Sequence, residues 1–434
     1  MTQAVIVREY ARLTTEPIQS SLDRAQISTT AFDWLCKLNA SFSAKGAAIV
    51  QIEGRRWLKL DNHVGVLETP CGTRLEILPK HFEQGDCVMQ SRQLLCRMIC
   101  TAFDLPRRDA GQADLERFDL PINEWVMMRF LQALDQLTKR GMRFDYQRVE
   151  EEQRYLRGQL DIAKQMRLPP GRQHYFQLRH DVFLPDRPEN RLLRLALERI
   201  VQGTLDPDNW RLANELRGLL HDVPFSTDIE QDFRLWRSDR LMAHYQAVKP
   251  WCEMILHNQL PMAVSGEWRG TSLLFPMEML FELYVEACLR RVLPKGAKLI
   301  RQPAREYLCR HDDGMMFRLK PDLLLEHEGQ RWILDTKWKR LDSADKRGKY
   351  GLSQADFYQM HAYGHRYFDD GSRADMLLIF PRKPSFLEAL PEFVYSERMR
   401  LWVVPFDLED GLLRVAGLHD RQELPAVFGQ MYPV

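Results

Sequence analysis

Asp322, Asp335 and Lys337 are the side chains whose types and spacing could do chemistry together. Two carboxylates held close together repel each other, which destabilises a partly dry site unless a proton or a cation lies between them. Mg²⁺ accepts carboxylate oxygens as ligands, and a nearby ammonium group can orient water and offset charge that develops on a phosphate. The three residues therefore predict metal-dependent phosphodiester hydrolysis. The alternative is an ion pair at a strand end, because short motifs also occur by chance.

The elements that must position these residues are two short apolar runs, 318–326 and 331–337. Each run is typical of a buried strand, and Gly329 between them can supply the positive φ of a tight hairpin turn. If the turn is centred there, Asp322 lies directly opposite Asp335, with Cβ atoms roughly 5 Å apart. The lysine lies two residues further on and projects from the same face.

A helix is expected before this hairpin, over residues 276–293, where apolar side chains recur at helical spacing. Glu278 lies within the apolar stripe and Glu282 lies at its edge. Spacing alone favours a solvent-facing role for such an acid over a role as a site ligand. Which of the two glutamates completes a metal site is left open.

A second helix is expected after the hairpin, because Ser353 and Asp356 together resemble a capping box. This helix would place Asp356, Gln359, Met360 and Tyr363 on one face. A basic loop precedes it and leaves directly from the proposed site, where phosphates would need cationic neighbours. Its Lys and Arg residues are Lys339, Arg340, Lys346, Arg347 and Lys349.

The 434 residues suit two or three domains, and the hydrophobic content of 45% is that of a globular protein. We expect a β-rich amino-terminal domain over 1–91, a helical middle region over 92–268, and an α/β domain with a mixed sheet over 269–434. Helix 30–38 and strands 49–52, 57–60, 64–67, 74–78, 299–307, 374–381 and 401–406 are the elements expected in the first and last domains.

The formal net charge is only +1, so a nucleic-acid partner would require local basic patches. The eight cysteines form no CxxC pair, which predicts reduced thiols and a cytoplasmic location. Neither a signal peptide nor an apolar run of membrane-spanning length is found, so no membrane partner is expected. A phosphate-binding Gly-x4-Gly-Lys-Ser/Thr loop is also absent from the sequence, so the chain has no obvious means of hydrolysing a nucleotide.

Together these motifs resemble the PD-(D/E)XK nuclease superfamily. The acidic pair and the lysine follow its pattern, and four elements occur in the order helix, strand, strand and helix. The matching residues are Glu282, Pro321-Asp322, Asp335-Thr336-Lys337, and Gln359 to Tyr363, which is similar to the QxxxY element of the RecB-like branch.

More narrowly, the chain resembles the McrC family, the nuclease subunits of McrBC modification-dependent restriction systems. This resemblance implies a DNA endonuclease that acts on 5-methylcytosine-containing double-stranded DNA. It also implies a partner, a hexameric McrB-like AAA+ GTPase ring, which the amino-terminal part would contact and stimulate. The similar stretches are 77–80, 156–160, 188–193, 276–285, 335–339 and 356–360.

On this resemblance, we expect Asp322 and Asp335 to ligate Mg²⁺, with Mn²⁺ able to substitute. The carbonyl of Thr336 would assist, and Glu282 would hold a metal-bound water or a second ion. A bound divalent ion lowers the pKa of water from about 15.7 toward neutrality in the best cases.

The remaining expected site residues would contact the attacking water, the phosphate or the DNA backbone. Lys337 would position the attacking water and stabilise the pentacovalent phosphate, while Gln359 and Tyr363 would support the site or contact the DNA backbone. The segment 311–316 departs from the family's pattern, because it adds two acids, Asp312 and Asp313, close to a site expected to bind DNA. Two alternatives stay open: a non-catalytic adaptor of a ring NTPase, and a stand-alone RecB-like repair nuclease.

Overall fold

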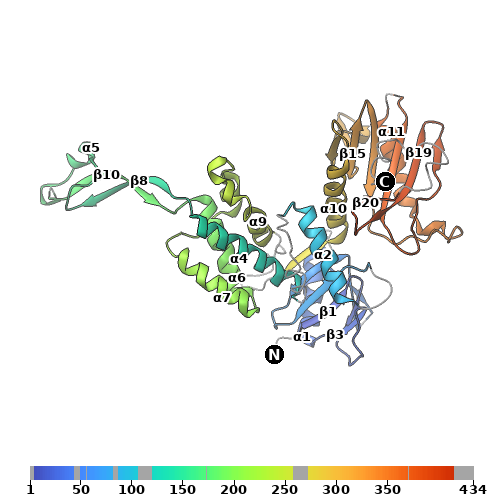
Figure 1. The fold of residues 1–434 in the computed structure, drawn as a ribbon, viewed down its shortest axis with the longest axis horizontal. Helices are drawn as coiled ribbons and strands as arrows, with labels where there is room; N and C mark the ends of the chain where they lie inside the picture. Colours follow the sequence, from blue (N-terminus) through green and yellow to red (C-terminus); the bar gives the residue numbers. More distant parts are fainter. Residues whose placement is uncertain are drawn as a thin grey trace. The chain divides into compact units, whose positions relative to one another are not determined.

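The computed structural model shows a mixed α/β chain that divides into two compact units (Figure 1). Unit 1 comprises Met1–Ile122 and Leu274–Val434, and unit 2 comprises Asn123–Leu273. The expected domain boundary between residues 268 and 269 lies outside the described residues. The structure describes residues 4–43, 49–54, 56–81, 87–105, 120–172, 174–257, 272–369 and 371–414.

Two four-stranded sheets form the amino-terminal part of unit 1, with strand orders β1-β7-β6-β11 and β3-β2-β5-β4. The first sheet comprises β1 (Ala4–Arg8), β6 (His63–Glu68), β7 (Arg74–Leu78) and β11 (Leu273–Pro276); the second comprises β2 (Arg12–Thr14), β3 (Arg24–Gln26), β4 (Val50–Glu53) and β5 (Trp57–Leu60).

The four strands expected between residues 49 and 78 are confirmed as β4, β5, β6 and β7, with ends that agree to within one residue. The expected helix over 30–38 is also confirmed, although α1 (Thr29–Ser43) continues further. Helix α2 (Val88–Ala102) follows and buries Leu94, Leu95, Met98 and Ile99. Helix α2 buries one face, as its apolar spacing indicated, whereas β6 and β7 are buried along almost their whole length.

A seven-stranded mixed sheet forms the carboxyl-terminal part of unit 1, with the order β12-β15-β16-β17-β19-β18 and β20 paired with β19. The central strands β16, β17 and β19 are parallel, and the others pair antiparallel. The bounds are Lys298–Arg301 (β12), Leu323–His327 (β15), Gln330–Thr336 (β16), Ala374–Pro381 (β17), Phe393–Ser396 (β18), Met399–Asp407 (β19) and Leu412–Leu413 (β20).

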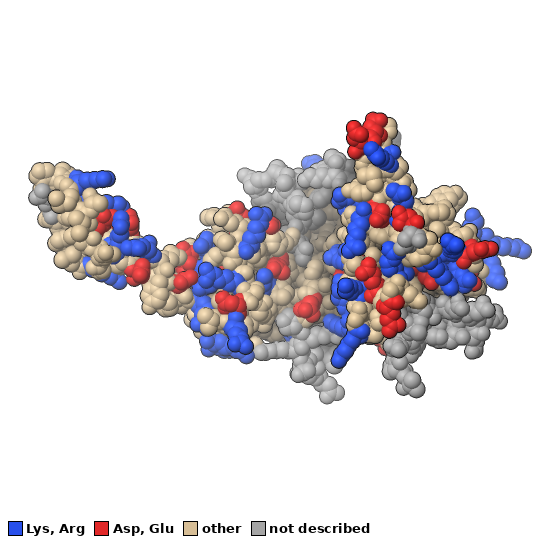
Figure 2. Space-filling model, turned by 90° about the horizontal axis from the view of Figure 1, so that it is seen from above, with Lys and Arg blue, Asp and Glu red and all other residues tan. Residues whose placement is uncertain are grey.

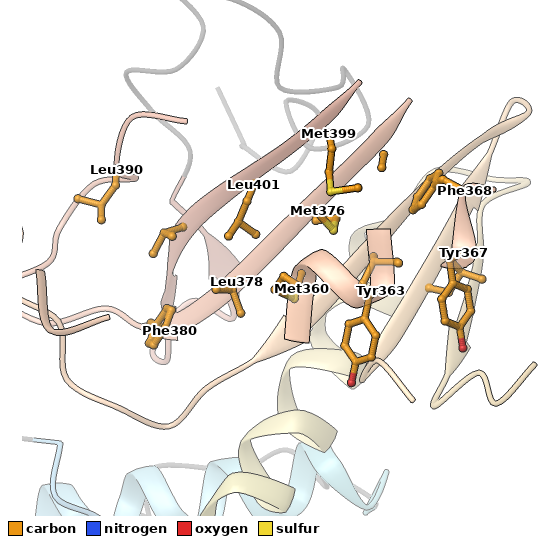
Figure 3. Close-up of a cluster of buried hydrophobic side chains, with 14 of the residues drawn as sticks. Met360, Tyr363, Tyr367, Phe368, Met376, Leu378, Phe380, Leu390, Met399 and Leu401 are labelled. Atoms are coloured by element: carbon orange, nitrogen blue, oxygen red, sulfur yellow. The ribbon is translucent and has the colours of Figure 1, made fainter. Parts of the chain in front are cut away.

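Helices cover both faces of this sheet, as the alternation of elements predicted. On one face, α11 (Gln354–Tyr367) contributes to an apolar core with β17 and β19 (Figure 3). On the other face, α10 (Met277–Val292) packs against β19, and the rings of Phe281 and Phe406 lie 6.1 Å apart. Because β17 is buried on both faces, its sequence is a continuous apolar run rather than an alternating one. The core contributed by α11 contains Met360, Tyr363 and Tyr367.

Two expected strands are shorter than the sequence pattern indicated. The strand expected over 299–307 ends at Arg301, and Pro303, which has no amide hydrogen, follows in the connecting loop. The run 318–326 becomes a strand only from Leu323. Residues before Pro321 instead form an exposed hairpin of β13 (Tyr307–His311) and β14 (Gly314–Arg318).

Unit 2 is largely helical, as expected, but it also contains an antiparallel arm that the sequence did not predict (Figure 1). In the arm, β8 (Asp145–Gln153) pairs with β10 (Phe176–Leu184), and the short β9 (Gln159–Leu160) pairs with β10. The charged residues of β8 resemble a solvated helix face in sequence. The helices of unit 2 are α4 (Ile122–Arg140), α5 (Ile162–Gln165), α6 (Pro188–Gly203), α7 (Pro207–Leu219), α8 (Ile229–Leu235) and α9 (Lys249–His257), with 3-10 turns at Pro170–Arg172 and Arg240–Tyr245.

The arm carries large apolar side chains in contact with solvent. Tyr146 is 70% exposed and Met166 is 82% exposed, and the ring of Phe183 lies 4.9 Å from that of Tyr146. Contiguous exposed apolar surface is uncommon on a monomer and marks interaction sites. No helix among the described residues is long and apolar enough to cross a lipid bilayer.

Candidate functional site

The hairpin formed by β15 and β16 has the turn and register that the sequence predicted. His327 pairs with Gln330 across a two-residue loop in which Glu328 and Gly329 have φ values of 49° and 78°. Positive φ at both central positions is the signature of a type I′ turn, which matches the twist of the flanking strands. Leu323 lies opposite Leu334, so one further step of the register places Asp322 opposite Asp335.

Asp322 is held at the start of β15 by the end of β16. Its Oδ2 accepts hydrogen bonds from the backbone amide of Thr336 at 2.6 Å and from the Thr336 hydroxyl at 2.7 Å. Thr336 is the last residue of β16 and follows Asp335 directly. One side chain therefore fixes the separation of the two strand ends that carry the aspartates.

Asp335 is almost completely buried, with 1% of its surface exposed. Burial and the nearby charge of Asp322 raise its pKa to about 7, although Lys337 opposes this shift through an ion pair with Asp335. Near neutral pH, this carboxyl group is therefore poised between its neutral and charged forms. A group of this kind, perturbed by burial and by a specific charged partner, is a candidate for a functional site.

Lys337 connects the acidic pair to α11. Besides its ion pair with Asp335, its Nζ donates to Oε1 of Gln359 at 3.2 Å. Burial lowers the pKa of Lys337, but Asp335, Asp322 and Asp356 together outweigh burial, so the net shift is upward. The lysine is therefore fully charged at neutral pH, as a group that stabilises a developing anion must be.

Gln359 and Tyr363 continue this connection, and the structure brings them to the site as expected. The side-chain amide of Gln359 donates to the hydroxyl of Tyr363 at 2.7 Å, and that hydroxyl donates to the carbonyl of Lys320 at 2.9 Å. Lys320 lies two residues before Asp322. The contacts of these two residues therefore run from Lys337 back to the segment that carries Asp322.

Glu282 is buried and lies within reach of the charge of Asp322, whereas Glu278 is exposed. Glu282 is 8% exposed and accepts hydrogen bonds from Gln302 Nε2 at 2.9 Å and from Arg301 Nε at 3.2 Å. Burial raises its pKa, and the charge of Asp322 raises it further. The solvent-facing role favoured by spacing alone was therefore wrong, because the fold of β12 and its following loop covers this edge of α10.

Asp356 was interpreted from the sequence as part of a capping box, and the structure corrects this. Ser353 occupies the N-cap position of α11 but makes no side-chain capping bond, while Asp356 is buried and binds Lys339 Nζ at 2.9 Å. Asp356 also raises the pKa of Asp335 and that of Lys337. Lys339 lies three residues beyond the end of β16, so strand periodicity gave no signal for this ion pair.

The donor set suits a hard divalent cation such as Mg²⁺. Within the described ranges, no three His, Cys, Asp or Glu side chains are grouped closely enough to hold a metal by themselves. Mg²⁺, however, usually binds one or two carboxylates and keeps several waters. Asp322 and Asp335, with the carbonyl of Thr336, are oxygen donors of this kind, and burial together with the charge of Asp322 raises the pKa of Asp335.

Basic residues of the loop that follows the site in sequence are exposed. Lys346, Arg347 and Lys349 all lie on the surface and follow the segment that contains Lys337. On the face shown in Figure 2, basic and acidic side chains alternate without a single dominant charge. Any attraction for a polyanion there must therefore be local, as the net charge of +1 already required.

The metal-free protein should lose stability as the pH rises through about 7. Asp335 keeps its proton in the folded state well above the pH at which an unfolded aspartate, with a pKa of about 3.9, has lost it. The folded state therefore binds more protons between these values, so the free energy of unfolding falls with rising pH. Thermal unfolding in a chelator between pH 5 and 8 measures this effect. Asp335→Asn should flatten the pH dependence, and an equal slope in the variant would contradict the assignment.

Residues 58–381 match the family described as McrBC 5-methylcytosine restriction system component. The chain is similar to one in the refined half-complex from the tetradecameric assembly of Thermococcus gammatolerans McrB AAA+ hexamers with bound McrC. The TM-score is 0.70 at 17% identity, covering 99% of this chain and 98% of that chain.

A second similar structure is a chain of the Thermococcus gammatolerans McrBC complex. The TM-score is 0.52 at 20% identity, covering 68% of this chain and 89% of that chain. At these identities, the likeness concerns the fold. No curated protein has a detectably similar sequence.

Proposed function

Because this chain belongs to the McrBC 5-methylcytosine restriction system components, we propose that it is the subunit that cleaves DNA. The proposed reaction is Mg²⁺-dependent hydrolysis of phosphodiester bonds in double-stranded DNA. The observation that carries this proposal is the convergence of Asp322, Asp335 and Lys337 where β15 begins and β16 ends. An acidic pair with a charged lysine beside it is the arrangement that metal-assisted phosphate chemistry requires.

We also propose that the carboxyl-terminal part of unit 1 is a PD-(D/E)XK nuclease domain. The support is the placement of each expected motif on the expected element of one mixed sheet. Glu282 lies on α10, the aspartates lie at the hairpin, and Gln359 lies on α11. We also propose that the chain has three domains, over residues 1–91, 92–268 and 269–434.

In the proposed mechanism, Asp322 and Asp335 would hold Mg²⁺, together with the Thr336 carbonyl. When bound, this ion lowers the pKa of water and neutralises phosphate charge. Asp335 must be deprotonated to bind a metal ion, and its ion pair with Lys337 favours the deprotonated carboxylate. Burial and the charge of Asp322 raise the pKa of Glu282, which would hold a metal-bound water or a second ion.

Lys337 offsets the negative charge that develops on the phosphate. Gln359 keeps the lysine in place by accepting its hydrogen bond, and Tyr363 orients Gln359 in turn. A preorganised cation of this kind costs no rearrangement at the moment of reaction, which is why such groups contribute strongly to rate.

The proposed partner is a hexameric AAA+ GTPase ring related to McrB. The similar Thermococcus gammatolerans structure contains McrB AAA+ hexamers with bound McrC. Residues 1–91 are one proposed contact with the ring. The arm is a second, because Tyr146 and Phe183 place apolar surface in solvent there. A cytoplasmic location, where such a ring and DNA meet, is also proposed.

The function is tested by assaying cleavage of methylated double-stranded DNA with the purified chain, with and without an McrB-like GTPase and GTP. We expect Mg²⁺-dependent cutting only when both proteins and GTP are present. Cutting by the isolated chain would indicate a stand-alone nuclease. GTPase stimulation without any cutting would indicate an adaptor. Tyr146→Ser in the same assay tests whether the arm contributes to GTPase stimulation.

A further inference from the structure

A buried polar junction joins the amino-terminal sheets of unit 1 to the segment that follows Lys337. Oε1 of Glu9 accepts hydrogen bonds from the amide of Lys80 at 2.7 Å and from the indole Nε1 of Trp338 at 2.8 Å. Beside them, Nζ of Lys383 donates to the carbonyl of Lys80 at 2.8 Å. We call Glu9, Lys80, Trp338 and Lys383 the Glu9 junction.

The strand order explains why these residues meet. Strands β1 and β7 are parallel, so Glu9, directly after β1, and Lys80, shortly after β7, lie at the same edge of their sheet. Strands β16 and β17 are also parallel, so Trp338 and Lys383 follow them at one edge of the seven-stranded sheet. Carboxyl ends of strands from two separate sheets therefore face each other across the Glu9 junction.

The Glu9 junction lowers the stability of the folded state in two ways, through a buried carboxylate and through a strained backbone. Glu9 is completely buried, and burial raises its pKa despite the hydrogen bonds from Lys80 and Trp338. Its second oxygen, Oε2, has no hydrogen-bond partner in the part of the chain that the structure describes. The next residue, Tyr10, has a φ of 63°, a left-handed conformation that is strained for a tyrosine. Apolar residues of similar size often stabilise a core as well as a buried charge or better.

Trp338 connects Glu9 to two parts of the proposed site. It follows Lys337 directly in sequence, so the orientation of its indole constrains the backbone that carries the lysine. Its ring also packs against Phe281, with centroids 5.3 Å apart, and Phe281 precedes Glu282 on α10. One indole therefore contacts the helix that carries Glu282 while fixing the end of β16.

We propose that Glu9 is a positioning residue for DNA cleavage, holding the indole of Trp338 so that Lys337 and Glu282 keep their places. This inference rests on the proposed function. A carboxylate from the amino-terminal sheets thereby becomes part of the cleavage machinery, although it touches neither the DNA nor the metal. Small displacements matter here, since a 1 Å misplacement of reacting groups can lower a rate by about a hundredfold.

The test compares Glu9→Ala, Glu9→Gln and Trp338→Phe in the complete complex with the GTPase ring, GTP and Mg²⁺. Glu9→Ala and Trp338→Phe each remove one partner of the indole hydrogen bond, and we expect kcat for DNA cleavage to fall about tenfold to a hundredfold. KM for DNA and GTPase stimulation should stay within about twofold, since neither surface is altered. Glu9→Gln keeps an Oε1 acceptor and should recover most of the lost kcat.

Glu9 and Trp338 should act through one shared hydrogen bond. The Glu9→Ala/Trp338→Phe double variant should therefore cleave no more slowly than the slower of the two single variants. Asp33→Ala, which removes an exposed acid from α1, is the matched control and should cleave normally. If Glu9→Ala does not fold, as judged by thermal unfolding, Trp338→Phe alone decides the question. Wild-type rates in folded Glu9→Ala or in Trp338→Phe would overturn this inference but leave the proposed function intact. Failure of the wild-type complex to cleave would instead overturn the proposed function.

Discussion

Asp335→Asn is expected to abolish DNA cleavage, lowering its rate by at least about a hundredfold, while GTPase stimulation by the same complex persists. The substitution preserves the shape of a side chain that is 1% exposed but removes the negative charge that would bind Mg²⁺. It also removes the repulsion from Asp322, so loss of folding is not the expected cause of inactivity. Cleavage of methylated DNA and Mg²⁺ binding by calorimetry are the measurements.

Glu388→Gln is the matched control for this charge change, since Glu388 is an exposed acid of the same sheet domain. That variant should cleave and bind Mg²⁺ as the wild-type protein does. Cleavage by Asp335→Asn at more than a tenth of the wild-type rate would remove Asp335 from the proposed metal site. Loss of GTPase stimulation in the same variant would point to a disrupted fold instead.

Lys337→Met is expected to lower kcat about a hundredfold to a thousandfold, with Mg²⁺ affinity retained. Methionine keeps much of the side-chain volume but cannot stabilise charge on the phosphate. Lys337 also lowers the pKa of Asp335, so that pKa should rise further in the variant. The residual activity should therefore require a higher pH than the wild-type activity does. Single-turnover cleavage across pH 6 to 9 and calorimetry measure both effects.

Lys295→Met provides the control, because Lys295 is exposed and lies between α10 and β12, away from the acidic pair in sequence. Its rate and pH profile should match those of the wild-type protein. A large loss of Mg²⁺ binding in Lys337→Met would show that the lysine supports the metal site rather than the phosphate. An unchanged pH profile would separate Lys337 from the ionisation of Asp335.

The sequence alone determined the local parts of this site. Gly329 and the apolar runs beside it predicted a tight hairpin, and the period of two along a strand then fixed which residues face each other. The structure confirms the turn and the register that bring Asp322 to Asp335. These features depend on neighbours within about fifteen residues, so spacing carries the information.

Helical spacing located α10 and a capping pattern located α11, but neither signal could decide how the polar residues of these helices are used. Glu282 lies at the edge of an apolar stripe, and only the covering loop with Gln302 and Arg301 makes it a buried group. Ser353 and Asp356 fit a local capping pattern, yet a lysine on a different segment binds Asp356 instead. In both cases a tertiary contact outweighed the local preference.

Only the tertiary structure decided the contribution of the amino-terminal sheets. Glu9 and Trp338 are 329 positions apart, and no spacing rule relates them. Their hydrogen bond exists because two sets of parallel strands end at facing edges, which is a property of topology. The sequence identified the candidate site residues, whereas folding brought the distant carboxylate of Glu9 to the indole of Trp338. The physical reason is that periodicity encodes the faces of single elements, while the meeting of elements depends on packing across the whole unit.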